Sequence, residues 1–329
     1  MKAKATEVLG QSAAAAALRD AIARVATSDA KVLISGESGS GKEVTARAIH
    51  ARSPRAARPF VAVNCAGIPE NLLESELFGH TKGSFTGAHR DKPGKLEMAD
   101  GGTVFLDEVA ETSPRMQGLL LRFLETGELQ RVGMDTMSPT VDVRVIAATN
   151  CRLDDLVREG RFREDLFYRL NVFAIELPPL RKRKDDLPLL VQSFLAEFNG
   201  RNRKSVSAVD SAAMRVLEQY NWPGNVRELR NVIERAVILC SGQFIEPKHL
   251  PPLMTDAPAA NPKSSLALSA GTTVEEAENQ LILLTLEHTR DNKTRAAEIL
   301  GISLKTLHNK LNKLRGRVPG AKGEETVSS

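Results

Sequence analysis

The apolar positions of the chain form short continuous runs in its first half and fall at helical spacing in its second half. Long helical stretches separate the runs. Because strands that alternate with helices are typical of parallel sheets, we predict an α/β fold with a parallel sheet over residues 1–178. Five runs have the length and composition of buried strands, at 32–34, 60–63, 104–106, 143–147 and 173–177.

Strand-like runs stop near residue 184, and the pattern from there to residue 239 is helical. We therefore expect a smaller helical lid subdomain at 179–250. Asn225 is predicted to cap one of its helices, with Glu228 reaching back to the helix start. The following segment, 251–273, is rich in Pro, Ala and Ser and has no periodicity, which predicts a flexible linker.

Three helical stretches follow the linker, at 274–289, 293–300 and 304–314. Gly301 begins the turn between the last two, as expected of a helix-turn-helix. We predict a small all-α domain at 274–317, followed by a disordered tail at 318–329. The last stretch carries one apolar stripe, formed by Leu304, Leu307, Leu311 and Leu314.

Composition places the chain among soluble globular proteins of two or three domains, with 42% hydrophobic and 26% charged residues. No apolar run reaches about 18 residues and the N-terminus lacks an apolar stretch, so we expect a cytoplasmic protein without a membrane partner. The three cysteines lack metal or redox spacing, which favours buried reduced thiols. Eight Lys and Arg but only two Asp and Glu lie within 289–317, a common feature of nucleic-acid binding.

A glycine-rich loop follows the first predicted strand and precedes a helical stretch. In this order the backbone N–H groups and the helix dipole bind phosphates, while Lys42 reaches the β- and γ-phosphates. The position after Lys42, normally Ser or Thr, is Glu43, so no hydroxyl is available there for Mg²⁺. The predicted cofactors are ATP and Mg²⁺. The loop comprises Gly36, Glu37, Ser38, Gly39, Ser40, Gly41, Lys42 and Glu43.

Two carboxylates, Asp107 and Glu108, end the apolar run at 104–106. At the carboxyl end of a parallel strand, Asp107 can hold the Mg²⁺ shell while Glu108 polarises the attacking water. Asn64 and Asn150 end two other predicted strands and can face the γ-phosphate from there. Taken alone, each Asn is better explained as a helix cap or turn residue.

A hexapeptide between the glycine-rich loop and Asp107 consists of Gly83, Ser84, Phe85, Thr86, Gly87 and Ala88. Two glycines flank an aromatic residue that has no apolar neighbour in the sequence. This pattern predicts a mobile loop that presents Phe85 outward to a partner. The alternative is an ordinary surface turn whose Phe folds back onto the core, and local composition alone favours that alternative.

Taken together, these motifs resemble the sigma-54-dependent transcriptional activators, the bacterial enhancer-binding proteins of the AAA+ superfamily. The resemblance extends from about residue 8 to 314, and Glu43 is a trait of the family. Ser84 departs from the commonest form of the hexapeptide, which has Ala there, but Ser is small and flexible enough to be accepted. The matching segments are GESGSGKE, ELFGHTKGSFTGA at 76–88, GKLEMADGGTVFLDEV at 94–109 and WPGNVRELRN at 222–231.

The resemblance implies that the hexapeptide engages sigma-54. It also implies that Asn64 restrains Glu108 until nucleotide and target are in place, that Asn150 is the first sensor, and that Arg227 reaches the nucleotide from the lid as the second. The chain starts directly before the ATPase domain. Either the protein is regulated from outside, or the sequence is part of a longer activator.

Arg163 and Arg169 match the arginines that this family supplies to the nucleotide of a neighbouring subunit. Such an arginine neutralises charge that develops on the transferred phosphoryl group. Because a head-to-tail interface repeats until the rotation closes, the resemblance implies a ring of identical subunits, hexameric or heptameric.

The segment 277–315 is similar to the Fis-type helix-turn-helix that ends many members of the family. Its apolar stripe alone would equally fit an amphipathic surface helix or a short coiled coil, and the preceding helix and turn favour DNA. Phosphate contacts are expected from the first helix and Lys313, and base reading from the last helix. The predicted DNA-binding residues are Lys293, Thr294, Arg295, Lys305, Thr306, His308, Asn309, Lys310 and Lys313.

We therefore predict an ATP-dependent activator that binds double-stranded enhancer DNA and remodels the closed complex of sigma-54 RNA polymerase holoenzyme to the open complex. An AAA+ unfoldase or helicase loader would share the nucleotide site but lack the hexapeptide. A non-catalytic DNA-binding regulator would need a degenerate site, whereas Lys42, Asp107 and Glu108 are all intact.

Overall fold

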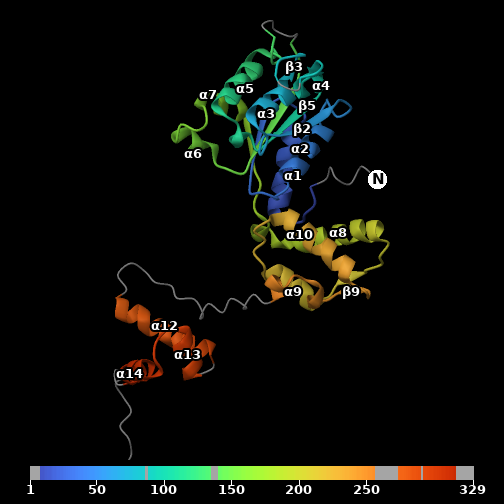
Figure 1. Cartoon of the computed structure of the whole chain (residues 1–329). Coiled ribbons are helices and arrows are strands. Elements are labelled where there is room, and N and C mark those ends of the chain that lie inside the picture. The colour runs from blue at the N-terminus through green and yellow to red at the C-terminus, as the bar shows by residue number, and fades with distance from the viewer. Residues whose placement is uncertain (1–7, 86–87, 135–139, 256–272, 290–291, 316–329) are drawn as a thin grey trace, which may run out of the picture. The chain divides into compact units, whose positions relative to one another are not determined.

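The computed structural model describes the chain apart from residues 1–7, 86–87, 135–139, 256–272, 290–291 and 316–329 (Figure 1). The chain divides into two compact units, Met1–Thr255 and Asp256–Ser329. Most of the predicted linker and the predicted tail at 318–329 lie outside the described residues. Within the described ranges, no helix is both long and apolar enough to span a membrane.

A five-stranded parallel sheet forms the centre of the first unit. The strand order is β2-β5-β6-β1-β7, and every neighbouring pair is parallel. All five predicted strands and the parallel sheet are confirmed. The carboxyl ends of the strands therefore meet at one edge, where ligands bind in such sheets. The strands are β1 (Val32–Ser35), β2 (Phe60–Asn64), β5 (Thr103–Asp107), β6 (Arg144–Thr149) and β7 (Phe173–Glu176).

Helices cover both faces of this sheet, and alternate strand residues enter opposite cores. Ile34 and Phe105 pack with residues of α1 and α2, whereas Leu33 and Leu106 pack with residues of the helices on the other face. A two-stranded antiparallel ribbon, β3 (Gly79–His80) with β4 (Lys92–Pro93), flanks the hexapeptide. The helices are α1 (Ala13–Ala26), α2 (Lys42–Ala51), α3 (Glu70–Phe78), α4 (Lys95–Met98), α5 (Pro114–Thr126), α6 (Leu153–Arg158) and α7 (Glu164–Leu170), and the 3-10 turn η2 spans Val109–Glu111.

The lid subdomain has its own core, built around the fully buried Trp222, whose Nε1 donates to Leu217 O at 2.9 Å. Two elements in and beside it differ from the prediction. A short parallel ribbon is present, and α11 lies inside the segment predicted as linker, because Met254 is buried in the lid core. The lid elements are η3 (Leu180–Lys182), η4 (Lys184–Asp186), α8 (Leu187–Asn202), β8 (Ala208–Val209), α9 (Ser211–Gln219), α10 (Asn225–Leu239), β9 (Phe244–Ile245), η5 (Pro247–His249) and α11 (Pro252–Thr255).

The predicted cap of α10 is half wrong. Gly224, not Asn225, occupies the cap position, and Asn225 is a fully buried residue at φ +52° whose side chain makes other contacts. Glu228 does reach back as predicted, since its Oε2 accepts from Gly224 N at 2.8 Å. The helix start is thus stabilised by Glu228, which leaves the Asn225 amide free to bind the glycine-rich loop.

The described part of the second unit contains three helices, α12 (Val274–His288), α13 (Lys293–Ile299) and α14 (Leu304–Arg315), as predicted. Gly301 stands at φ +66°, which favours glycine in the turn before α14. The apolar stripe is only partly buried: Leu307 is fully buried and Leu311 packs against the core, but Leu304 is 41% exposed. Leu304 is the first residue of α14, and the packing of this helix begins one turn further on.

Candidate functional site

The glycine-rich loop joins β1 to α2 at the carboxyl edge of the sheet, in the predicted order of strand, loop and helix. Its first residue is tied to β6, since Gly36 N donates to Thr149 O at 3.2 Å. Gly39 stands at φ +74°, and a Cβ there would lie 2.3 Å from Gly224 O of the lid. The loop therefore needs glycine both for its backbone conformation and for its contact with the lid.

Lys42 and the two carboxylates meet next to this loop. Lys42 is only 7% exposed, and its Nζ donates to Gly36 O at 3.0 Å and to Glu108 Oε1 at 3.2 Å. The other carboxylate oxygen of Glu108 accepts from Asn150 N at 3.0 Å, and Asp107 Oδ1 accepts from Glu108 N at 3.1 Å. The structure thus brings together residues from the ends of β1, β5 and β6, as the sequence predicted.

The electrostatics of Asp107 fit a cation-binding carboxylate. Burial and the neighbouring Glu108 charge raise the pKa of Asp107 above its usual value. Within the part of the chain that the structure describes, no three His, Cys, Asp or Glu side chains are grouped to hold a metal. Mg²⁺ is commonly bound by one or two carboxylates together with phosphate oxygens and waters, so Asp107 and Glu108 fit this ion.

Glu43 does not join the carboxylate pair. Its Oε1 accepts from Arg47 Nη2 at 2.7 Å, an exposed i,i+4 ion pair along α2. At the residue after Lys42, the helix thus carries a surface ion pair where a hydroxyl would normally stand.

The two predicted sensor asparagines have different surroundings. Asn64 pairs in register with Asp107 across β2 and β5, but its Oδ1 accepts from Ala66 N at 2.9 Å. No hydrogen bond between the described Asn64 and Glu108 is present, so the predicted restraint is not formed in this structure: the Asn64 amide closes a turn on its own backbone. Asn150 contacts Glu108 through its backbone N–H, while its side-chain Oδ1 accepts from Cys151 Sγ at 2.9 Å.

The lid contacts the loop through the start of α10. Arg227 Nη1 donates to Ser38 Oγ at 2.9 Å, and Val226 N donates to Gly39 O at 3.0 Å. Asn225 Nδ2 donates to Ser38 O at 3.0 Å and to Glu37 Oε2 at 3.1 Å. Arg227 therefore lies at the glycine-rich loop, and its role as the second sensor of the nucleotide stays a prediction.

A hinge residue that sequence reasoning missed, Arg181, also binds the loop. Arg181 donates to both carboxylate oxygens of Glu37, at 2.8 and 2.5 Å. Its hydrogen bonds, with those of Asn225, lower the pKa of Glu37 to about 2. The basic run at 181–184, three residues after the last predicted strand, was the available signal for this contact.

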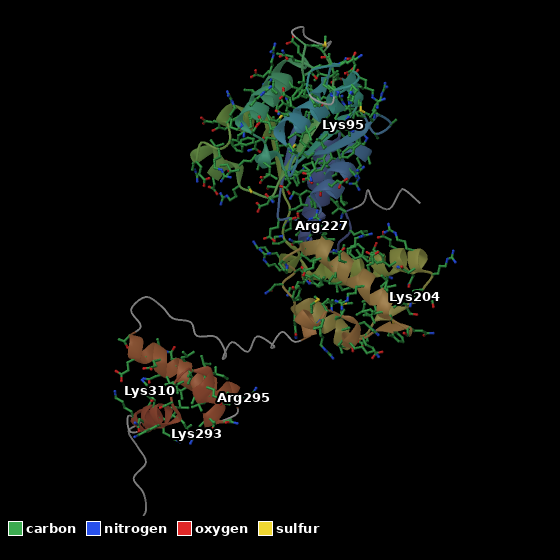
Figure 2. All side chains as sticks on the ribbon, viewed as in Figure 1. Lys95, Lys204, Arg227, Lys293, Arg295 and Lys310 are labelled. Carbon is green, nitrogen blue, oxygen red and sulfur yellow. The ribbon has the colours of Figure 1, made fainter. Side chains whose placement is uncertain are left out.

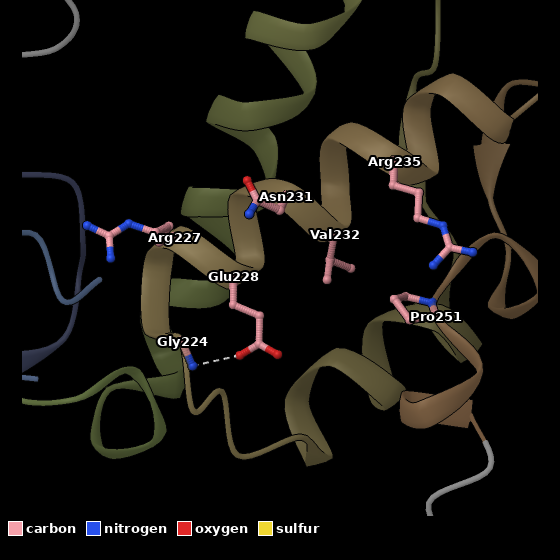
Figure 3. Close-up of a pocket in the computed structure, with 7 residues that line it drawn as sticks. All are labelled: Gly224, Arg227, Glu228, Asn231, Val232, Arg235 and Pro251. Atoms are coloured by element: carbon pink, nitrogen blue, oxygen red, sulfur yellow. Dashed lines mark hydrogen bonds between the residues drawn. The ribbon is translucent and has the colours of Figure 1, made fainter. Parts of the chain in front are cut away.

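An open hollow of about 480 Å³ lies on the lid beside α10. Figure 3 shows Arg227 at its edge, extending away from Glu228 and Arg235. The hollow is lined by Gly224, Arg227, Glu228, Asn231, Val232, Arg235 and Pro251.

The predicted trans-acting arginines lie on the surface around α7. Arg163 precedes the helix and forms a two-point ion pair with Asp165, at 2.8 and 3.1 Å. Arg169 is exposed and its Nε donates to Leu124 O at 3.4 Å. Neither forms a hydrogen bond with the glycine-rich loop or Glu108 of the same chain, among the described residues.

The described residues of the hexapeptide are folded back, since Gly83 N donates to Ala88 O at 2.8 Å. Phe85 is half-buried and meets the ring of His80 edge-on, with centroids 5.0 Å apart and planes at 68°. The prediction that Phe85 points outward is therefore wrong for this structure, because His80 supplies an aromatic partner that a count of apolar neighbours overlooks. Ser84 Oγ donates to Thr81 O at 2.8 Å, and Ala88 is buried. Two predicted members, Thr86 and Gly87, lie outside the described residues.

A second loop supports the hexapeptide. A Cβ at Gly133 would lie 2.5 Å from Ser84 Cβ, so these two residues are in close contact. Arg131, two residues earlier, donates to both oxygens of Glu97 on α4, each at 2.8 Å. Ser84 is therefore packed against a neighbouring loop that is itself fixed to α4.

Among the described residues, the predicted DNA-binding cations divide into those without an ion pair and those that pair with a carboxylate. Lys293 and Arg295 of α13 are exposed (Figure 2). In contrast, Lys310 Nζ lies 2.7 Å from Glu278 Oε2, and Lys313 Nζ lies 3.0 Å from Glu275 Oε1. Thr306 bonds Ser303 Oγ at the start of α14 through both its backbone N and its hydroxyl. The remaining predicted contacts are exposed, namely Thr294, Lys305, His308 and Asn309.

These features define a P-loop ATPase of the AAA+ class. They are a glycine-rich loop with a buried lysine after β1, two carboxylates at the end of β5, and a helical lid that binds the loop through an arginine. Comparisons of the whole chain agree. The family model for the Sigma-54 interaction domain matches residues 8–176, the AAA+ ATPase lid domain matches 181–267, and the Bacterial regulatory protein, Fis family, matches 273–314. The chain belongs to the sigma-54-dependent transcriptional activators.

Curated relatives and solved structures support this assignment. The transcriptional regulatory protein ZraR of Klebsiella oxytoca is 50% identical over 93% of this chain and 68% of its own length. The regulatory protein AtoC of Escherichia coli (strain K12) is 48% identical over 88% of this chain and 63% of its own. The crystal structure of NtrX from Brucella abortus in complex with ADP has a TM-score of 0.70 and 35% identity, over 94% of this chain and 69% of that chain. The predicted family, fold class and ATPase are thereby confirmed.

Proposed function

We propose that the protein binds enhancer DNA and uses ATP hydrolysis to convert the closed complex of sigma-54 RNA polymerase holoenzyme to the open complex. The observation that carries this proposal is the group formed by Lys42, Asp107 and Glu108 at the sheet edge, next to a loop that the lid contacts through Arg227. An NtrX structure in complex with ATP, at 37% identity, supports ATP as the nucleotide.

The chain's own residues have distinct roles in hydrolysis. The glycine-rich loop and Lys42 bind the phosphates, and Arg227 orients them from the lid. Glu108, which Asn150 N holds at 3.0 Å, accepts the proton of the attacking water at a carboxylate oxygen. Mg²⁺, held by Asp107, would neutralise charge that develops on the phosphoryl group when it is bound.

Arg163 and Arg169 are proposed to act on the nucleotide of the neighbouring subunit. Both are exposed, and their only hydrogen bonds within the described chain are to α5 or α7. An arginine that completes a site on another copy requires a closed ring, hexameric or heptameric, of identical subunits.

The hexapeptide is proposed to transmit hydrolysis to sigma-54. Gly83 to Ala88 is joined to β5 by β4 and α4, and α4 also fixes the supporting loop through the Glu97–Arg131 pair. The chain path from Asp107 to the hexapeptide thus runs back along β5 and then through α4 and β4. The exposed face of α13 and α14 would bind enhancer DNA, with Lys293 and Arg295 on phosphates.

A substitution in the hexapeptide separates this function from simple ATP hydrolysis. Thr86→Ala is expected to leave ATPase activity and DNA binding largely intact and to abolish open-complex formation, measured with purified holoenzyme on a sigma-54 promoter. Ser84→Ala is the matched control and should retain activation. Loss of ATPase activity in Thr86→Ala would indicate a structural loop, and normal open-complex formation would contradict sigma-54 contact by this residue.

A further inference from the structure

A buried arginine of the lid hinge contacts the glycine-rich loop and has no part in the mechanism above. Arg183 lies between η3 and η4 and is only 5% exposed. Its Nη2 donates to the backbone oxygen of Ser40 at 2.8 Å. Within the described chain no carboxylate lies within ion-pair distance of Arg183. Burial lowers the pKa of Arg183, and the charge of the buried Asp186 offsets this only in part. Burying a cation without a directly bonded anion is costly, so this position calls for a specific reason.

The acceptor of this hydrogen bond belongs to the peptide that joins Ser40 to Gly41. In a trans peptide the C=O and N–H groups point in opposite directions, so a donor that fixes the carbonyl also fixes the N–H. Gly41 directly precedes Lys42 and stands at φ +110°, a conformation that residues with a Cβ rarely adopt. Arg183 therefore sets the direction of a backbone N–H at the start of α2, where phosphates bind.

The segment that carries Arg183 is held firmly on both sides. Asp186, fully buried, accepts from Gln11 N at 2.8 Å and from Ser12 N at 2.7 Å. Leu180 N donates to Asn225 Oδ1 at 2.8 Å. The guanidinium is thus mounted on a hinge anchored to the start of α1 at one end and to the lid at the other.

We propose that Arg183 is a positioning residue for nucleotide binding. It orients the Ser40–Gly41 peptide and places a positive charge under the phosphate site. This inference rests on the proposed nucleotide site. Because phosphates present in both substrate and transition state would meet the same N–H, the contribution falls on nucleotide affinity and KM rather than on kcat.

The test compares Arg183→Met with the wild-type protein, both as the full chain. It measures the Kd for a fluorescent ADP analogue, kcat and KM for ATP, and the melting temperature with and without ADP. Arg183→Met is expected to raise Kd and KM about tenfold with kcat within about twofold of wild type. Arg183→Lys keeps the charge but not the planar guanidinium, and should weaken binding about threefold. Arg215→Met removes an exposed lid arginine and should change nothing.

Three results decide the inference. Wild-type affinity in Arg183→Met, or a loss of kcat at unchanged Kd, overturns it. If Arg183→Met does not fold, the Arg183→Lys variant decides. A wild-type Kd in Arg183→Lys, together with a wild-type rise in its melting temperature with ADP, means that Arg183 is structural only. If the wild-type protein itself fails to bind nucleotide, the proposed function is wrong instead.

Discussion

Lys42 Nζ and Glu108 Oε1 lie 3.2 Å apart, so the lysine proposed to bind phosphate and the carboxylate proposed to activate water are each other's partners. Both side chains are well shielded, at 7% and 16% exposure. Phosphates that bind Lys42 would release one carboxylate oxygen of Glu108 for water, while Asn150 N keeps the other oxygen in place. Nucleotide binding and preparation of the base are thereby linked.

Glu108→Gln is expected to lower ATP turnover about 100-fold or more, because the amide cannot accept the proton. Nucleotide binding should be retained or tightened, since the neutral amide no longer competes with phosphate for Lys42. Steady-state hydrolysis and nucleotide titration measure the two effects. Glu111→Gln, an exposed carboxylate three residues later, is the control, and equal turnover by both variants would contradict the role of Glu108.

Gly39→Ala should weaken the contact between lid and loop. A Cβ there would lie 2.3 Å from Gly224 O, and the φ of +74° adds backbone strain. Gly67→Ala is matched in strain, at φ +71°, but meets nothing within 4 Å. Backbone strain costs about 1–2 kcal/mol in each, so Gly39→Ala should lose more unfolding free energy in urea than Gly67→Ala. A smaller loss in Gly39→Ala would mean that the lid shifts without cost.

The pair of Glu37 with Arg181 should contribute less to stability in acid. Arg181 lowers the pKa of Glu37 from 4.5 to about 2, so the folded state favours the charged form. The contribution is complete above about pH 4.5 and is lost as the pH falls toward 2. The difference in urea midpoint between wild type and Glu37→Gln should therefore shrink over this range. Because the pair is exposed, salt should reduce the difference as well, and a difference independent of pH would contradict the prediction.

The three cysteines should react unequally with iodoacetamide at neutral pH. Burial raises the pKa of the Cys65 thiol to about 12, and Cys240 is also buried, whereas Cys151 is exposed. Thiolates are the reactive form, so native protein should be labelled at Cys151, and unfolded protein at all three positions. Peptide mass spectrometry locates the label. The expectation of three buried thiols was wrong for Cys151. Early labelling of Cys65 would contradict its burial and show that the end of β2 opens in the native protein.

Lys293→Ala should weaken DNA binding across all sequences and reduce the slope of log affinity against log salt by about one, because an exposed lysine that binds a phosphate releases one counterion. Lys310→Ala should cost less affinity, since Lys310 already pairs with Glu278. Fluorescence anisotropy at several salt concentrations gives both slopes. A larger loss in Lys310→Ala would mean that this pair opens on DNA.

The sheet and the carboxylate pair were predictable because their causes are local. Buried parallel strands read as continuous apolar runs, and the position of Asp107 and Glu108 follows from where such a run ends. Asn225 was misjudged because its partners are distant in the sequence, and Phe85 because its partner is not an apolar residue. Asn225 meets Glu37 and Ser38 from far along the chain, and Phe85 meets a histidine, which counts as polar in a sequence pattern. Arg183 belongs to the basic run at 181–184, but the run does not reveal its partner, because its acceptor is a backbone oxygen.

The last helix of the lid bears on how the protein can be divided for separate study. Met254 of α11 is 7% exposed and belongs to the core around Trp222, although composition places it in the linker. A fragment cut after residue 250 would leave a vacancy in that core, whereas one that ends at residue 255 would keep it filled. Preparations of the isolated ATPase should therefore carry these five residues.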